Sequence, residues 1–215
     1  MTDVDASALP ELFGRYAERF AAEKQALIEL DGKVGDSDLG LTMAKGFAAA
    51  DAALAEAAPD SLSAGMKTAG AAIAKAAPST MGTLMATGFL RGSKALEAAS
   101  VLDAPALAAF WGAFRDGIAQ RGKAQLGDKT VLDVLHPVAE TLAAQAEAGA
   151  TPAAAARAAT ETARAALEAT RDMVAQHGKA AAFGDKSKGL QDAGSTVACI
   201  LIEETSAFLT AREDT

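Results

Sequence analysis

The chain has 215 residues, half of them apolar and only 5% aromatic, and a formal net charge of −8; this length suits a single domain over residues 1–215 with a substantial core. The negative charge argues against nucleic acid as a partner, because phosphate backbones attract clustered Lys and Arg side chains. The acidic N-terminus without a signal-peptide pattern, the lack of ~20 uninterrupted apolar residues and the single cysteine together predict a cytoplasmic protein that does not enter a membrane.

Helix-spaced apolar residues, interrupted by capping residues, prolines and glycines, predict about eight helices. In chain order the expected helices cover residues 7–30, 41–57, 62–76 and 80–99, a segment after Asp103, then 130–147, 151–176 and a segment that begins near Ser195. Alanine-rich runs support these helices, since alanine has the highest helix propensity and its small side chain lets helices approach closely. No segment alternates like a strand, so the sequence predicts an all-α array in which sequential helices are antiparallel neighbours.

Four connections between the predicted helices have an unusual composition. Three are long and rich in glycine, at residues 31–40, 122–129 and 178–194, and the fourth is the short segment 78–83. They follow the first, third, fifth and seventh helices. In an up-and-down array such alternate connections lie at the same end, so we expect all four to share one rim.

The first of these connections contains three carboxylates, Asp31, Asp36 and Asp38, among glycines that permit sharp turns. Converging carboxylates repel one another unless a cation lies among them, and oxygen ligands without His or Cys favour Mg²⁺. Mg²⁺ usually keeps a few protein ligands and binds substrate phosphates as well, so the loop predicts a nucleotide site. The alternative is structural: Asp38 would cap the helix that begins near Gly40.

The last connection combines glycines with lysines and an aspartate. Free N–H groups at a helix N-terminus bind phosphate, and Lys179, Lys186 and Lys188 would add full positive charges there. The alternative for these lysines is an ordinary solvated loop. Asp192 is expected to cap the last helix and is also a candidate nucleotide contact.

Other conspicuous side chains are better explained by packing. Phe110, Trp111 and Phe114 follow helical spacing and are expected in the core. Cys199 lies in an apolar run and is expected to be a buried, unreactive thiol. Neither histidine has the partner pattern of a catalytic dyad.

Three motifs in register resemble the family of dihydroxyacetone kinase L subunits. The first is Asp31 with Gly35-Asp36-Ser37-Asp38-Leu39-Gly40, the second is Gly127-Asp128-Lys129-Thr130-Val131-Leu132-Asp133, and the third is Gly184-Asp185-Lys186-Ser187 followed by Gly189-Leu190-Gln191-Asp192-Ala193-Gly194-Ser195-Thr196. They occur in the family's order and spacing over nearly the whole chain. The sequence departs from the family pattern at Leu39, Thr42, Leu190 and Ala193, and Lys179 takes the place of an arginine.

The resemblance implies a closed up-and-down barrel of eight antiparallel helices that binds Mg²⁺ with ADP or ATP at one rim. The implied metal ligands are Asp31, Asp36 and Asp38. The implied nucleotide contacts are Gly40, Thr42, Ser79, Thr80, Gly122, Val131, Lys179, Asp192 and Gly194.

The implied function is that of a phosphotransferase subunit. The chain would deliver a phosphoryl group to a small ketose such as dihydroxyacetone, held by a separate K subunit, and would itself supply no catalytic side chain. The donor is either exchangeable ATP or bound ADP recharged by a phosphotransferase-system phosphocarrier protein. The rival interpretation is a non-catalytic nucleotide-binding or regulatory module on the same helical barrel.

Overall fold

The computed structural model describes residues 4–213, and over this range the chain is helical and has no strand, which confirms the all-α prediction. Its α-helices are α1 (Leu9–Asp31), α2 (Leu39–Ala57), α3 (Leu62–Ala76), α4 (Thr80–Ala95), α5 (Ala104–Gly122), α6 (Leu132–Glu147), α7 (Pro152–Ala169) and α8 (Ala193–Glu213). Three short 3₁₀ helices accompany them: η1 (Ala6–Ala8), η2 (Thr170–Asp172) and η3 (Lys179–Ser187). Within residues 4–213 no helix combines the length and the hydropathy needed to cross a membrane.

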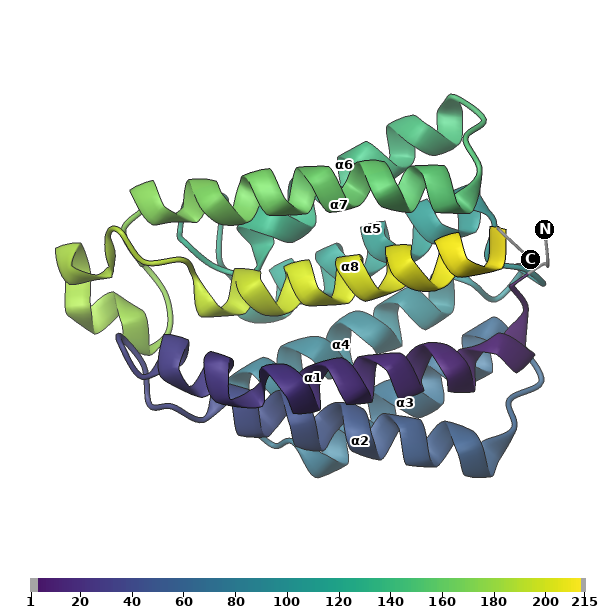
Figure 1. The fold of residues 1–215 in the computed structure, drawn as a ribbon, viewed down its shortest axis with the longest axis horizontal. Helices are drawn as coiled ribbons and strands as arrows, with labels where there is room; N and C mark the ends of the chain where they lie inside the picture. The colour runs from purple at the N-terminus through teal and green to yellow at the C-terminus, as the bar shows by residue number, and fades with distance from the viewer. Residues whose placement is uncertain (1–3, 214–215) are drawn as a thin grey trace.

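Each α-helix packs against the next in sequence, and α8 also contacts α1 and α6 (Figure 1). The α1–α2 and α7–α8 connections lie together at the left end of the molecule in Figure 1. The described part of the chain, residues 4–213, begins and ends at the opposite end. There the N–H of Leu102, between α4 and α5, donates to the carbonyl of Val4 (2.7 Å), and Thr151, before α7, donates to Glu213 (2.6 Å).

Polar contacts join the first and last helices. Arg15 and Arg19 of α1 lie 3.6 Å from the carboxylates of Glu204 and Glu203 of α8, respectively. Beneath these half-buried pairs, the buried hydroxyl of Tyr16 lies 2.6 Å from the Thr205 hydroxyl. Tyr16 and Thr205 are 189 positions apart in the sequence, so these contacts hold the first and last α-helices side by side.

A run of touching aromatic rings forms the centre of the core. Phe89 of α4 contacts Phe13 of α1, Phe47 of α2 and Phe110 and Phe114 of α5, with ring centroids 5.2 to 6.0 Å apart. Trp111 is also buried, which confirms the prediction for the three aromatic side chains of α5.

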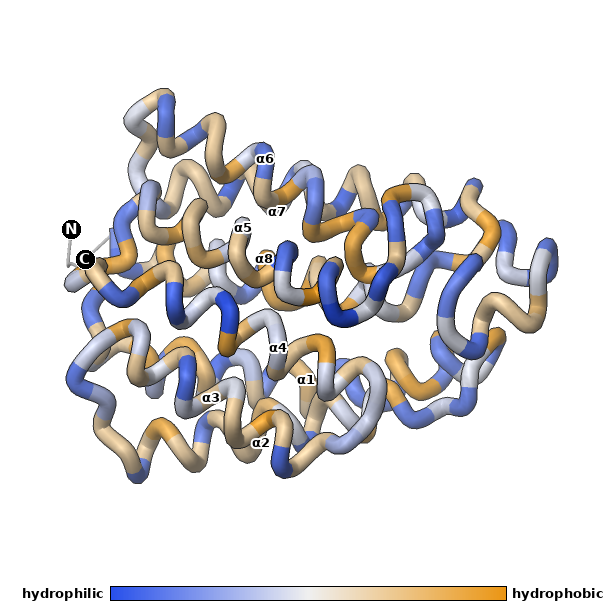
Figure 2. The backbone as a smooth tube through the Cα atoms, turned by 180° about the vertical axis from the view of Figure 1, so that it is seen from behind, coloured by the Kyte–Doolittle hydropathy of each residue, from blue (hydrophilic) through white to orange (hydrophobic). Residues whose placement is uncertain are grey.

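Small residues bring these helices close together. A Cβ added to Gly88 of α4 would lie 2.7 Å from the ring of Phe114, and one added to Gly92 would lie 2.5 Å from the ring of Phe110. Along the helices that Figure 2 shows in front, hydrophobic and hydrophilic residues are interspersed, as expected for helices with one buried face. Cys199 is buried in α8, as predicted.

Several predicted helix ends were wrong by two to seven residues. Helix α4 ends at Ala95 rather than at 99, because Leu96 N–H turns back to the Ser93 carbonyl. Helix α7 ends at Ala169 rather than at 176, where the Thr170 hydroxyl donates to the Leu167 carbonyl and the chain continues as η2. The segment from 178 to 194, expected to be a loop, contains η3.

Candidate functional site

The α1–α2 connection brings the three aspartates of the first motif together. One carboxylate oxygen from each of Asp31, Asp36 and Asp38 lies within 4.8 Å of the others. The turn depends on a small residue, because a Cβ on Gly35 would lie 2.1 Å from Asp31 Oδ1 and 2.8 Å from the Asp31 carbonyl oxygen. Ser37 adopts a positive φ of 62°, which reverses the chain between the second and third carboxylates.

Asp31 also holds the start of the next helix. Its Oδ2 accepts from the backbone N–H groups of Asp38 (3.1 Å) and Leu39 (3.4 Å). The side chain of Asp38 makes no capping hydrogen bond, so the structural alternative for Asp38 was wrong. The Asp38 carboxylate is therefore left available for a ligand.

The local charge favours a bound cation. Lys179, at the start of η3, donates to Asp36; this contact lowers the pKa of Asp36 and raises the pKa of Lys179. Burial, followed by the charges of Asp36 and Asp31, raises the pKa of Asp38. Three carboxylates face one ammonium group, and a divalent cation would offset the remaining negative charge.

A second group of predicted residues meets where α8 begins. Asp192 accepts from the N–H of Ser195 (2.6 Å), which confirms its predicted role as a cap, and Ser195 Oγ donates to the Thr130 carbonyl (2.8 Å). A Cβ on Gly194 would lie 2.8 Å from Met81 Cε in α4 and 3.4 Å from the Val131 nitrogen. The start of α8 is thus packed against the starts of α4 and α6.

Burial raises the pKa of the half-buried Asp192 to about 6, from an ordinary 3.8. The folded state then holds this proton more tightly than the unfolded chain does. The contribution of Asp192 to the free energy of unfolding is therefore largest below about pH 4, decreases as the pH rises towards 6, and is constant above that.

We expect Asp192→Asn to remove this decrease. Relative to the unchanged protein, the free energy of unfolding of the variant should rise between pH 4.5 and 6 and level off by pH 7.5. Urea denaturation across this range measures the difference, and two parallel pH profiles would contradict the assignment.

The other predicted contacts lie at helix ends or inside helices. Ser79 caps α4 by accepting from Gly82 N–H (3.1 Å), Thr80 is the first residue of α4, and Gly122 is the last residue of α5. Thr42 is buried in α2. Gly40, also in α2, packs against the backbone of α1, since an added Cβ would lie 2.1 Å from the Lys24 carbonyl oxygen.

The lysines of the α5–α6 and α7–α8 connections differ in how deeply they are buried. Lys186 and Lys188 are exposed, as the solvated-loop alternative expected. Lys129, which received no separate role, is only 3% exposed, and its Nζ donates to three backbone carbonyls. The only feature of the sequence that could have pointed to a role for Lys129 was its place in the second motif.

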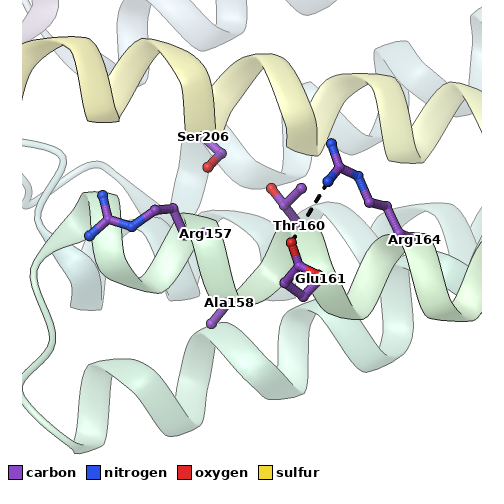
Figure 3. A pocket seen from close by; sticks show the side chains of 6 residues that line it. All are labelled: Arg157, Ala158, Thr160, Glu161, Arg164 and Ser206. Atoms are coloured by element: carbon purple, nitrogen blue, oxygen red, sulfur yellow. Dashed lines mark ion pairs between the residues drawn. The ribbon is translucent and has the colours of Figure 1, made fainter.

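A pocket of about 370 Å³ lies elsewhere, between α7 and α8 (Figure 3). Arg157 and Arg164 flank it, and each already pairs with a glutamate of α8, Glu213 at 3.1 Å and Glu203 at 2.8 Å. Its other lining residues include Thr160 and Ser206, which are buried. This pocket has no free charge directed into it, so the aspartates at the end of the molecule remain the candidate site.

Comparisons with known proteins agree on one family. Residues 33–207 match the DAK2 domain. The chain is 32% identical over 189 residues to "PEP-dependent dihydroxyacetone kinase, ADP-binding subunit DhaL" of Escherichia coli, covering 88% of this chain and 90% of that protein. It is 33% identical over 186 residues to "PEP-dependent dihydroxyacetone kinase 1, ADP-binding subunit DhaL" of Listeria innocua, covering 86% of this chain and 88% of that protein.

A solved structure has the same fold. The dihydroxyacetone kinase from C. freundii in complex with AMP-PNP and Mg²⁺ matches with a TM-score of 0.72 and 20% identity. The match covers 96% of this chain and 35% of the C. freundii chain, so this chain corresponds to about a third of that polypeptide.

Proposed function

Because the chain belongs to the DAK2 domain family, we propose that it is the Mg-nucleotide-binding L subunit of a dihydroxyacetone-type kinase. The observation that carries the proposal is the convergence of Asp31, Asp36 and Asp38 within 4.8 Å, with Lys179 beside them. Two relatives of similar length are named as ADP-binding subunits of such kinases.

We propose a closed barrel of eight antiparallel helices, formed as one domain over residues 1–215, as the scaffold. The contacts of α8 with both α7 and α1 support closure. The nucleotide would lie at the end that carries the α1–α2 and α7–α8 connections, with its contacts at the residues that the family resemblance implies: Gly40, Thr42, Ser79, Thr80, Gly122, Val131, Lys179, Asp192 and Gly194.

Asp31, Asp36 and Asp38 would hold Mg²⁺, for which their oxygen donors are well suited. When bound, Mg²⁺ neutralises charge that develops on a transferring phosphoryl group. Lys179 would add a positive charge beside the phosphates, and the helix N-termini near Gly194 and Ser79 would offer backbone N–H donors.

We propose that the acceptor is a small ketose held by a separate K subunit and that no side chain of this chain acts as its general base. The word "PEP-dependent" in the names of both relatives favours bound ADP recharged by a phosphocarrier protein over exchange of ATP. A cytoplasmic location is consistent with the single buried thiol of Cys199.

The test has two arms. In the first, thermal unfolding is measured with ADP, with Mg²⁺ and with both; we expect a clear rise in Tm only when both are present, since a ligand that binds only the folded state stabilises it. In the second, phosphorylation of dihydroxyacetone is assayed with this chain alone and with a K subunit and phosphoryl donor added, and we expect turnover only in the complete mixture.

The outcomes separate the proposal from its rival. Stabilisation by Mg-ADP without turnover in the complete mixture would favour the non-catalytic module. No effect of nucleotide at any Mg²⁺ concentration would contradict nucleotide binding, and turnover by the chain alone would contradict the need for a K subunit.

A further inference from the structure

Lys129 is a buried lysine whose ammonium group is fully used by backbone carbonyls. Its Nζ donates to the carbonyl oxygens of Ser187 (2.6 Å), Leu190 (2.7 Å) and Met173 (3.2 Å), which matches the three donors that an ammonium group has. Lysine is among the residue types that are least often buried, because its charge must leave water. Burial lowers the pKa of Lys129, while the charge of Asp192 partly opposes this effect.

The backbone at Lys129 adds a second cost. Its φ of 61° lies in the left-handed region, which a glycine would adopt without strain. A side chain at this position directs the ammonium group inward, so the hydrogen bonds of that group must offset both the strain and the desolvation. The arrangement indicates a specific task for the ammonium.

The three carbonyls belong to one segment, the connection from 170 to 192 between α7 and α8. They lie just after η2, at the end of η3 and two residues before Asp192. Within this connection burial is confined to Thr170, Ala175 and Ser187, so it has almost no apolar core of its own. The ammonium group takes the place of such a core by joining three separate points of the segment.

Two further contacts tie the same segment to the connection between α5 and α6. The N–H of Gln176 donates to the Asp128 carbonyl (3.0 Å), and His177 Nε2 lies 3.0 Å from Asp128 Oδ2. Both of these are at the surface, whereas the Lys129 contacts lie beneath it. Lys129 is therefore the interior attachment of the connection.

This connection carries two of the candidate nucleotide contacts. Lys179 lies between the Met173 and Ser187 attachments, and its own ammonium group reaches Asp36. Asp192 follows the Leu190 attachment directly and caps α8. A shift of the attached carbonyls would move both residues relative to the aspartates.

We propose that Lys129 is a positioning residue for nucleotide binding: its buried ammonium group holds the α7–α8 connection so that Lys179 faces the three aspartates and Asp192 caps α8. This inference rests on the proposed function and deepens it. Lys129 itself touches neither metal nor nucleotide in this assignment.

Two variants isolate the ammonium group. Lys129→Met keeps a chain of similar length and the same backbone strain, whereas Lys129→Gly relieves the strain; both remove the charge. Lys123→Gly is the matched control, because Lys123 has nearly the same φ, 59°, and an exposed side chain. We expect both Lys129 variants to weaken Mg-ADP binding, measured by calorimetry, at least tenfold, and the control to leave it unchanged.

Hydrogen exchange locates the effect. In both Lys129 variants the amides of residues 173–190 should lose protection, while the amides of residues 31–40 and the binding of Mn²⁺ alone should stay as in the unchanged protein. A double-mutant cycle adds a readout that general destabilisation would not produce. If Lys179→Ala and Lys129→Met each weaken binding about tenfold, the double variant should also weaken it about tenfold rather than a hundredfold.

The inference is overturned if Lys129→Gly binds Mg-ADP as well as Lys123→Gly does, if the two single effects are additive, or if circular dichroism shows that a Lys129 variant fails to fold, since the residue would then support the whole fold. If the unchanged protein does not bind Mg-ADP, the proposed function fails. Exchange at residues 173–190 then still decides whether Lys129 holds the α7–α8 connection.

Discussion

Replacing Asp38 with asparagine is expected to abolish Mg-dependent ADP binding while leaving the fold intact. Asp38 is the cleanest of the three aspartates to change, because Asp31 holds the start of α2 and Asp36 pairs with Lys179, whereas Asp38 makes no capping hydrogen bond. Loss of one carboxylate from the proposed Mg²⁺ site should weaken binding by on the order of 100-fold or more, since even residues that only support metal ligands contribute 10- to 100-fold. Calorimetric titration with Mg-ADP measures the loss.

The same substitution should not lower the stability of the unliganded protein at neutral pH. Burial and the charges of Asp36 and Asp31 disfavour the charged form of Asp38, so a neutral amide removes repulsion. Asp60→Asn is the matched control, because Asp60 is an exposed aspartate in the α2–α3 connection. Tight Mg-dependent binding by Asp38→Asn, or an equal loss in Asp60→Asn, would count against the metal assignment.

Replacing Gly40 with alanine is expected to destabilise the protein by roughly 3 kcal/mol, whether or not a ligand is present, as overpacking of a close contact does. The added Cβ would lie 2.1 Å from the Lys24 carbonyl oxygen and 2.9 Å from Ile28 Cγ1. The first of these atoms belongs to the backbone of α1, which cannot rotate away, so α1 and α2 must separate. Urea denaturation without nucleotide measures the change.

Gly112→Ala provides the comparison. Gly112 lies inside α5 with nothing within 4 Å of an added Cβ, so alanine there should stabilise the protein by about 0.5 to 1 kcal/mol through helix propensity. If Gly40→Ala were as stable as the unchanged protein and lost only nucleotide affinity, Gly40 would be a ligand contact without a packing role.

The all-α fold could be predicted because its determinants are local. Thr151 and Pro152 start α7 where capping rules place a start, and apolar spacing identified the buried face of α5. The ends of α4 and α7 could not be predicted as well. They are set by tertiary and turn contacts, such as the bond from Asp192 N–H to the Thr170 hydroxyl (3.0 Å), which joins residues 22 positions apart.

The candidate site also has a part that local sequence predicts and a part that depends on tertiary contacts. Asp31, Asp36 and Asp38 lie within eight residues, so a glycine-rich turn is enough to suggest that they converge. The contact between Lys179 and Asp36 spans 143 residues and could be anticipated only from the alternation of connections between the two ends. Apart from its place in the second motif, nothing in the sequence distinguishes the buried Lys129 from the exposed Lys123, because the difference arises from which side of the backbone faces the interior.

Both ends of the described chain lie beside the α4–α5 and α6–α7 connections, at the far end of the molecule from the aspartates (Figure 1). A linker, affinity tag or surface anchor joined at either side would therefore extend away from the region where nucleotide and partner would arrive. The same geometry suits a domain carried within a longer polypeptide, as in the C. freundii kinase chain, of which this chain matches 35%. Immobilised on a sensor chip through either end, the protein should keep its aspartate-bearing rim open to solution.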